Sequence, residues 1–412
     1  MDKYILREYQ QEAISKALWY FDNYNNHFII VMPTGAGKSL IISNVAKQLS
    51  GDVLILQPTK EILESNYTKL LSYGFTESEI GIYSASCNSK TIGKITYATI
   101  GSVYNNPELF NHIKYVILDE CHLLNPKNLK GMYNKFFSAI GNPRVMGLTA
   151  TPYRLVNTYN RINGYNFEVN ICLQTINRIY PFFFKKIAYE KPIQELFNEG
   201  YLSKVEYINC DEEFDVSQLE LNSTGGDFNK EKLESYLNQS KRLSKAYQAI
   251  LDIKDKVKHI LVFASSKRQA RAIKQLLLNE NLPVSIVFGD TNINVRDNIL
   301  NNFKKGYIKI VINVGVLTTG FDFPELDCVV IIRPTISLAL YYQMIGRGVR
   351  ISPSKAKCYV LDCCNNVERL GRIETIKLGV EDGFKTIVET EVGKISGVPL
   401  RRFIIDKNKD KQ

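Results

Sequence analysis

The sequence predicts two α/β domains in tandem, each built around a parallel sheet. Short apolar, β-branched runs alternate with longer amphipathic stretches, and this pattern occurs in both halves of the chain. The runs are continuously apolar, which is typical of strands buried on both faces of a parallel sheet. With 412 residues, the chain is too long for one compact core and long enough for two.

The predicted strands and the first helix can be placed by residue number. The strands are expected at 28–32, 53–57, 115–118 and 145–148 in the first half, and at 260–263, 284–288, 308–312, 328–332 and 358–361 in the second. Residues 11–21 place Ala13, Ala17 and Phe21 on one helical face. The expected domains are 1–155 and 206–375, separated by a connector at 156–205 and followed by a tail at 376–412. The last dozen residues are expected to be solvated and frayed.

Composition narrows the class of protein. An apolar content of 45% and a charged content of 23% are typical of a soluble globular protein. The formal charge of +10 fits a polyanionic partner, and equally a merely basic enzyme. No apolar run approaches the ~20 residues that cross a bilayer, and the N-terminus lacks the pattern of a signal peptide, so no membrane partner is expected. Eight cysteines without a Cys-x-x-Cys pair indicate reduced thiols in a cytoplasmic protein.

A glycine-rich segment follows the first predicted strand. It consists of Thr34, Gly35, Ala36, Gly37, Lys38 and Ser39. Backbone N–H groups in such a loop, together with the start of the following helix, cradle phosphates. Lys38 would reach the β- and γ-phosphates of ATP, and Ser39 would ligate Mg²⁺. The common pattern has glycine where Met32 stands. The alternative is a glycine turn before an ordinary surface helix.

Two carboxylates end the run at 115–118. Asp119 would hold Mg²⁺, and Glu120 would polarise the attacking water. Alternatively, the pair caps a helix and begins its first turn. His122 would couple the nucleotide to nucleic acid, or serve as a hydrogen-bonded structural residue.

Further short strings follow in a known order. They are Leu6-Arg7-Glu8-Tyr9-Gln10, Gln57-Pro58-Thr59-Lys60, Leu148-Thr149-Ala150-Thr151-Pro152, Leu317-Thr318-Thr319-Gly320-Phe321-Asp322, Arg333-Pro334-Thr335 and Gln343-Met344-Ile345-Gly346-Arg347-Gly348-Val349-Arg350. With these strings, residues 1 to about 370 resemble a superfamily 2 helicase of the DExH kind, a group that tolerates a residue such as Met32 at the start of the glycine loop. Within the superfamily the chain is similar to the bacterial RadD family of DNA-repair ATPases. The cysteine-rich, zinc-binding region of that family has no counterpart in this sequence.

The resemblance implies two RecA-like domains with an ATP cleft between them, and it implies roles for individual residues. Arg7 would stack on adenine and Gln10 would read its edge. Gly320 and Asp322 would meet the ribose and phosphates, and Arg347 and Arg350 would act as arginine fingers. The implied coupling residues are His122, Thr149, Thr151 and Gln343.

Nucleic acid is the implied partner, with DNA favoured over RNA. The implied backbone contacts are Thr59, Lys60, Thr99, Ser266, Lys267, Thr291 and Thr319. For an isolated Ser or Thr, turn capping is the competing explanation. A DExH-type RNA helicase and a non-motor scaffold that binds nucleic acid are the alternative functions. We expect a monomer of bacterial or phage origin in the cytoplasm, with single-strand-binding or repair proteins as further partners.

Overall fold

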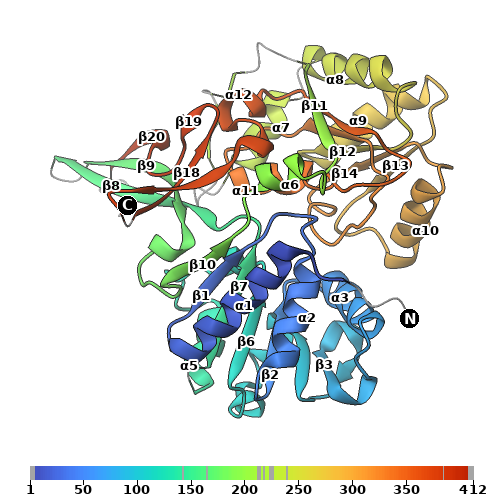
Figure 1. The fold of residues 1–412 in the computed structure, drawn as a ribbon. Coiled ribbons are helices and arrows are strands. Elements are labelled where there is room, and N and C mark those ends of the chain that lie inside the picture. The colour runs from blue at the N-terminus through green and yellow to red at the C-terminus, as the bar shows by residue number, and fades with distance from the viewer. Residues whose placement is uncertain are drawn as a thin grey trace. The chain divides into compact units, whose positions relative to one another are not determined.

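The computed structural model describes residues 5–406 except 142, 164–165, 211–214, 217–218, 222–226, 238–239 and 384. The chain divides into two compact units, seen in the ribbon of Figure 1. Unit 1 comprises Met1–Tyr153 and Thr175–Pro192, and unit 2 comprises Arg154–Gln174 and Ile193–Gln412. Each unit is an α/β structure with a parallel sheet, as predicted.

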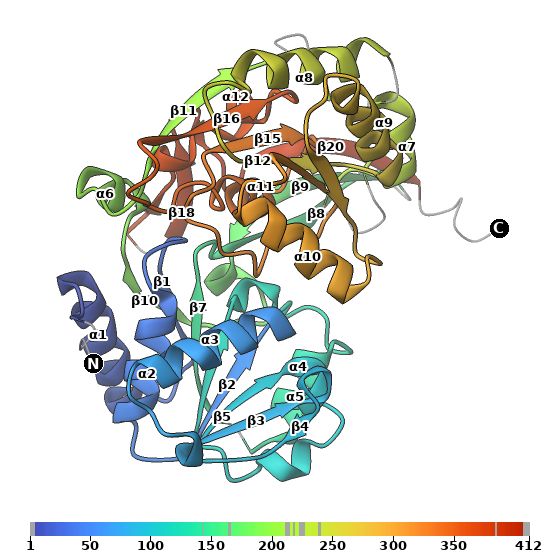
Figure 2. The same cartoon turned by 90° about the vertical axis from the view of Figure 1, so that its right-hand side faces the viewer.

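Unit 1 is built on an eight-stranded sheet in the order β10-β1-β7-β6-β2-β5-β3-β4. Its strands are β1 (Phe28–Val31), β2 (Val53–Gln57), β3 (Ile80–Ser84), β4 (Ser89–Lys90), β5 (Ile95–Thr99), β6 (Tyr115–Asp119), β7 (Arg144–Thr149) and β10 (Lys186–Glu190). Its helices are α1 (Glu8–Asn23), α2 (Lys38–Gln48), α3 (Lys60–Ser72), α4 (Ile100–Val103) and α5 (Met132–Ala139). Every pairing is parallel except β3 with β4. Helices α2 and α3 lie on one face of this sheet, and α4 and α5 on the other (Figures 1 and 2).

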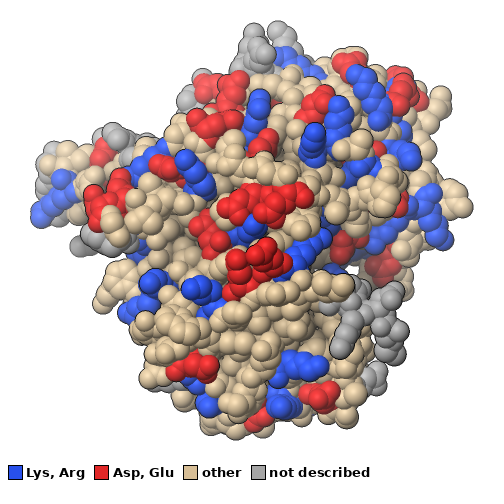
Figure 3. Space-filling view, in the orientation of Figure 1, with Lys and Arg blue, Asp and Glu red and all other residues tan. Residues whose placement is uncertain are grey.

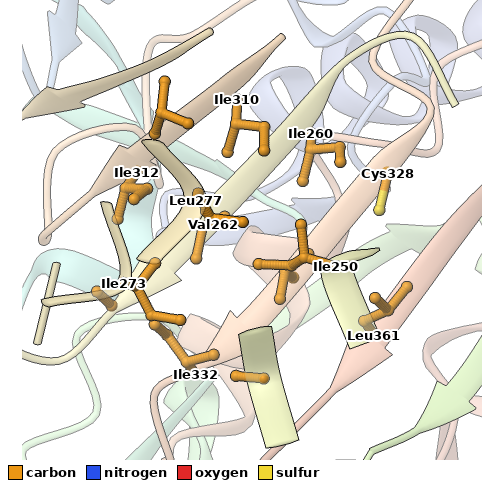
Figure 4. Packing of buried hydrophobic residues seen from close by; sticks show 14 of the residues in the cluster. Ile250, Ile260, Val262, Ile273, Leu277, Ile310, Ile312, Cys328, Ile332 and Leu361 are labelled. Atoms are coloured by element: carbon orange, nitrogen blue, oxygen red, sulfur yellow. The ribbon is translucent and has the colours of Figure 1, made fainter. Parts of the chain in front are cut away.

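Unit 2 is built on six parallel strands in the order β11-β16-β15-β12-β14-β13. They are β11 (Lys204–Asn209), β12 (Ile260–Ala264), β13 (Val284–Val287), β14 (Ile310–Asn313), β15 (Cys328–Ile332) and β16 (Lys357–Asp362). The helices are α6 (Ile193–Asn198), α7 (Lys230–Leu237), α8 (Ser240–Ile253), α9 (Lys267–Leu278), α10 (Ile293–Lys304), α11 (Leu338–Ile345) and α12 (Asn366–Leu370). Figure 4 shows the core between sheet and helices, where Ile250 of α8 and Ile273 of α9 pack over Ile260, Val262 and other strand residues.

Two smaller antiparallel sheets belong to unit 2. One consists of β17 (Lys377–Glu381), β18 (Lys385–Thr390) and β19 (Gly393–Lys394), and the other pairs β20 (Pro399–Asp406) with β9 (Asn166–Thr175) beside β8 (Tyr153–Asn163). The expectation of a frayed end is therefore wrong for residues 401–406, whose backbone pairs with β9. The remaining residues, 407–412, lie outside the described part. The stretch expected as a connector, 156–205, supplies most of β8, all of β9, β10 and α6, and the start of β11.

The surface carries both signs of charge. On the face drawn in Figure 3, basic and acidic side chains intermix over each unit, so the excess of Lys and Arg forms no continuous basic patch there. Among the described helices, none combines the length and the apolar character that crossing a membrane requires.

Candidate functional site

The glycine loop of unit 1 joins β1 to α2. Gly35 and Gly37 have φ angles of 85° and 82°, in the left-handed region that favours glycine. A Cβ atom on Gly37 would lie 2.5 Å from Nε2 of Gln10. Helix α2 begins at Lys38, directly after the loop. The loop thus joins a buried strand to a helix N-terminus, whose positive end attracts phosphate.

The start of α1 is bound to this loop. Gln10 Nε2 and the Tyr9 hydroxyl both donate to the carbonyl oxygen of Ala36, at 2.9 and 3.1 Å. The backbone N–H of Arg7 donates to Gln10 Oε1 at 3.0 Å, and Arg7 Nη1 donates to the Tyr9 hydroxyl at 2.9 Å. Arg7 and Gln10 therefore lie beside the loop, and reading of adenine by them stays a prediction. Sequence reasoning missed Tyr9, since nothing in the sequence shows where its hydroxyl points.

The carboxylate pair lies at the end of β6. Asp119 is buried, and its Oδ1 accepts a hydrogen bond of 3.0 Å from the backbone N–H of Glu120. Burial and the neighbouring Glu120 raise the pKa of Asp119, while Lys38 opposes that rise. Lys38 Nζ lies 3.9 Å from Glu120 Oε1 and donates to the carbonyl oxygen of Met32 at 3.5 Å. The lysine of the loop and the two acids thus form one cluster.

Two predicted coupling residues, His122 and Thr149, contact Glu120, and a third, Thr151, contacts both of them. His122 Nδ1 lies 2.9 Å from Thr149 Oγ1, 3.3 Å from Thr151 Oγ1 and 3.4 Å from Glu120 Oε2. Thr149 Oγ1 donates to Glu120 Oε2 at 3.3 Å and accepts from the Thr151 N–H at 3.0 Å. The Thr149 carbonyl accepts from the Met32 N–H at 3.0 Å, which connects this group to the glycine loop.

The same cluster offers oxygen ligands for a magnesium ion. Among the described residues, no group of three or more His, Cys, Asp or Glu side chains could hold a metal. Mg²⁺ needs fewer protein ligands, because it binds through one or two carboxylates plus substrate phosphates. Asp119, at the end of β6, and the Ser39 hydroxyl, near the start of α2, are oxygen donors of this kind.

A buried amide beside Asp119 supports this fit. Gln57 follows the paired residues Leu56 and Leu118, so it lies in register beside Asp119 at the ends of β2 and β6. Gln57 is fully buried, and neither Oε1 nor Nε2 has a hydrogen-bond partner among the residues that the structure describes. An unpaired buried amide is costly, so an added polar group at this position would be bound favourably. Sequence reasoning noted the string around Gln57 without assigning the residue to the site.

The arginines of unit 2 are held close to the string that ends at Asp322. Arg347 is 9% exposed, and it donates from Nη1 to the Phe321 carbonyl at 2.9 Å and from Nε to the Gln343 carbonyl at 3.4 Å. Arg350 forms an ion pair with Asp322. Burial lowers the pKa of Arg350, and Asp322 opposes that shift. Gly320 lies two residues before Asp322, and its φ angle is 73°.

The predicted nucleic-acid contacts fall into two groups, one in each unit. In unit 1, Thr59 Oγ1 caps α3 by accepting from the Ile62 N–H at 3.4 Å, and Lys60 pairs with Glu64 at 3.4 Å. Thr99 is the register partner of Gln57, so it ends the strand next to β2. Its Oγ1 lies 3.0 Å from the hydroxyl of Ser102, in a local hydrogen bond.

In unit 2, Ser266, Lys267 and Thr291 lie close together. Ser266 caps α9 by accepting from the Gln269 N–H at 3.1 Å, and Lys267 Nζ lies 2.6 Å from Asp290 Oδ2. Thr291 follows Asp290, and its Oγ1 accepts from the Phe288 N–H at 2.8 Å. Thr319 lies in another loop, after β14. Local capping thus occupies several of these hydroxyls, and contact with nucleic acid stays a prediction for all seven residues.

Comparison with known proteins identifies two matching families. Residues 3–154 match the family described as the type III restriction enzyme res subunit, and residues 241–352 match the helicase conserved C-terminal domain. A Saccharomyces cerevisiae protein named as an ATP-dependent helicase, IRC3, is 26% identical over 375 residues, which are 87% of this chain and 51% of the yeast protein. The DNA 3'-5' translocase XPB2 of Sulfurisphaera tokodaii is 24% identical over 393 residues, 86% of this chain and 81% of that protein.

Solved structures share the fold. The type ISP restriction-modification enzyme LlaBIII, bound to DNA, has a TM-score of 0.60 at 16% identity and covers 88% of this chain and 28% of its own. S. cerevisiae Dbp5, bound to RNA and ADP BeF3, has a TM-score of 0.58 at 16% identity and covers 89% of this chain and 87% of its own. These matches confirm the predicted fold of tandem RecA-like domains. The chain spans about half the length of curated relatives such as the yeast protein.

Proposed function

We propose that this chain, an ATP-hydrolysing helicase of superfamily 2, uses the energy of ATP hydrolysis to move along DNA. The observation that carries the proposal is the group in unit 1 in which His122 and Thr149 lie within hydrogen-bonding or ion-pair distance of Glu120, and Lys38 forms an ion pair with Glu120. In this group Lys38 would bind phosphate and the Glu120 carboxylate would act as general base. His122 and Thr149 would transmit a structural change at either of these residues. The similarity to the RadD family extends the proposal to a role in DNA repair.

The residues of unit 1 have distinct proposed tasks in hydrolysis. The glycine loop and the N-terminus of α2 bind the phosphates, and Lys38 balances their charge. Glu120 orients a water and accepts its proton, while Thr149 and His122 hold that carboxylate in place. Asp119 and Ser39 would hold Mg²⁺, which would supply neutralisation of phosphate charge.

Unit 2 supplies the remaining proposed groups. Gly320 and Asp322 would contact the ribose and phosphates, and Arg347 and Arg350 would stabilise charge on the transferring phosphoryl group. Gln343, whose carbonyl accepts a hydrogen bond from Arg347, would couple this group to nucleic acid. Since these groups belong to a different unit from the glycine loop, hydrolysis would require closure of one unit on the other.

We expect single-stranded DNA to stimulate ATP hydrolysis at least about tenfold more than RNA of equal length and base composition. The naming of XPB2 as a DNA translocase and the DNA bound to LlaBIII support DNA, while the RNA bound to Dbp5 supports the alternative. Because contacts to phosphates release counterions, the DNA concentration that gives half-maximal stimulation should rise steeply with salt concentration. Steady-state ATPase assays with both polymers, over a salt series, measure this.

Each other outcome of that assay selects a different function. Stimulation by RNA alone would indicate an RNA helicase. Lack of stimulation by either polymer, combined with nucleic-acid binding, would indicate the non-motor scaffold. The Lys38→Ala variant is the control, because it should remove hydrolysis and leave nucleic-acid binding intact.

Gln57→Leu is expected to stabilise the nucleotide-free protein and weaken its response to magnesium nucleotide. Removing a buried amide without partners should raise the free energy of unfolding by about 1 kcal/mol. If the Gln57 amide binds a polar group of the loaded site, the additional rise in Tm caused by Mg²⁺ and a non-hydrolysable ATP analogue should shrink. Thermal unfolding with and without these ligands measures both effects.

The exposed Gln48, at the end of α2, provides the control. Gln48→Leu makes the same chemical change at the surface and should leave both the Tm and the ligand-induced shift near their original values. A lower Tm for Gln57→Leu in the free protein, or a ligand-induced shift of undiminished size, would contradict the assignment of Gln57 to the site.

A further inference from the structure

A cavity of about 460 Å³ lies in unit 2, away from every site proposed above. Its walls include Lys258, His259, Lys304, Lys305, Lys309 and Glu325. These residues precede β12, β14 and β15, or end or follow α10, elements labelled in Figures 1 and 2. The cavity therefore adjoins the amino ends of the parallel strands. The predicted contacts Ser266, Thr291 and Thr319 follow the carboxyl ends of strands in the same sheet.

The walls of the cavity are strongly basic. Four lysines and one carboxylate, that of Glu325, line the cavity. Lys309 Nζ donates to the Val257 carbonyl at 2.6 Å, and Lys304 Nζ lies 5.7 Å from the centre of the Phe321 ring. Among the described residues, Lys258 and Lys305 have no ion-pair partner. Like charges gathered around a cavity repel one another, and an anion between them would relieve that repulsion.

His259 adds a buried polar group to the same wall. The residue is 5% exposed, and within the described part of the chain both ring nitrogens lack a hydrogen-bond partner. The ring packs edge-on against Phe323 and Phe303, with centroids 4.7 and 5.4 Å away. Burial lowers the pKa of His259, against the opposing effect of Asp327 and Glu325, and the ring carries at least one N–H donor in either protonation state. A buried donor without an acceptor is costly, which points to a ligand that supplies one.

We propose that this cavity binds a phosphate-bearing anion, held by the ammonium groups of Lys258 and Lys305 and by the His259 N–H. The volume accommodates one or two phosphate groups with their water. The proposal does not depend on the function proposed for the glycine loop. The cavity is lined by other residues, which adjoin the amino ends of the strands in the sheet of unit 2.

The cavity is connected to the arginines through its aromatic neighbours. Phe303 lies between His259 and Phe321, with centroid distances of 5.4 and 6.4 Å. The Phe321 carbonyl in turn accepts the 2.9 Å hydrogen bond from Arg347. An anion that draws Lys304 away from the Phe321 ring would therefore act on the segment that orients Arg347.

Titration calorimetry with inorganic pyrophosphate tests the proposal in a Lys38→Ala background, which removes binding at the glycine loop. We expect one remaining site per chain. Adding Lys258→Ala and Lys305→Ala should weaken pyrophosphate binding at least tenfold, as expected on removing hydrogen bonds to a charged group. Lack of pyrophosphate binding in the background chain, or an affinity unaffected by loss of both lysines, would overturn the proposal.

Two further variants separate the site from general charge and from folding. Lys254→Ala with Lys256→Ala removes the same number of positive charges from the half-buried Lys254, which pairs with Asp255, and the exposed Lys256, and should leave pyrophosphate affinity unchanged within about twofold, because both side chains lie outside the cavity. His259→Phe keeps the ring packing and removes the N–H, so it should weaken binding while the Tm stays the same or rises. Unchanged affinity in His259→Phe would remove His259 from the site.

The source of the phosphate can be distinguished in the same experiment. A short single-stranded oligonucleotide is added to the background chain that is saturated with pyrophosphate. If the oligonucleotide displaces pyrophosphate, and this competition is lost in the chain with Lys258→Ala and Lys305→Ala, the ligand is the backbone of nucleic acid. Undisturbed pyrophosphate binding would identify a free anion.

Discussion

Glu120→Gln is expected to lower the turnover number for ATP by about 10²- to 10⁴-fold, the usual contribution of a general base. The amide has the shape of the carboxylate but cannot accept the proton of the attacking water. Its neighbours remain available, since Thr149 Oγ1 can still donate to the side-chain oxygen that replaces Glu120 Oε2. Binding of ATP should persist, because Lys38 and the glycine loop are unchanged. Steady-state turnover and equilibrium binding of a fluorescent ATP analogue measure the two quantities separately.

Glu64→Gln is the matched control. Glu64 pairs with Lys60 on the surface of α3, so its replacement makes the same chemical change away from the carboxylate cluster and should leave turnover unchanged. Unchanged turnover in Glu120→Gln would remove Glu120 from its proposed role. Loss of nucleotide binding together with turnover would show that Glu120 contributes to the cluster with Lys38 rather than to the chemical step.

Central strands with continuous apolar runs could be predicted from the sequence, as could the edge strand β13, whereas the edge strands β10 and β11 could not. The apolar runs predicted as strands at 28–32 and 260–263 correspond to β1 and β12, which are central and fully buried. Strand β11 was missed because its apolar and polar residues are mixed, and β10 because its apolar run is only three residues long between Lys186 and Glu190. The buried strand β5 was missed for another reason. It contains Thr96, whose hydroxyl is satisfied by the backbone of Gly93, so a polar residue could lie in the interior.

The candidate site was predictable where its residues follow strands directly. The glycine loop, Asp119 and Thr149 all follow or end parallel strands, whose carboxyl ends meet at one edge of the sheet. Contacts made by side-chain packing could not be predicted, since the hydrogen bond from Tyr9 to the loop depends on where α1 lies. The isolation of the Gln57 amide likewise depends on everything packed around it.

Arg347→Lys is expected to lower nucleic-acid-stimulated turnover by roughly 10³-fold or more, the effect of losing an arginine finger. The structure explains why lysine is a poor substitute. Two nitrogens of the Arg347 guanidinium bond the carbonyls of Phe321 and Gln343, which orients the remaining N–H groups. A lysine ammonium cannot reproduce that fixed planar geometry. Steady-state ATPase assays with and without DNA measure the loss.

Arg350→Lys separates the two arginines. A lysine at position 350 can still form an ion pair with Asp322. The local contacts of Arg350 therefore depend less on the planar guanidinium than those of Arg347 do. If both arginines contact phosphate, each substitution should lower turnover while the Tm and the affinity for ATP stay near their original values. If Arg347 only supports the fold, Arg347→Lys should lower the Tm and leave turnover per folded molecule intact. That outcome would leave Arg350 as the sole arginine acting on the phosphate, with Arg347 serving to hold the segment from Phe321 to Asp322 in place.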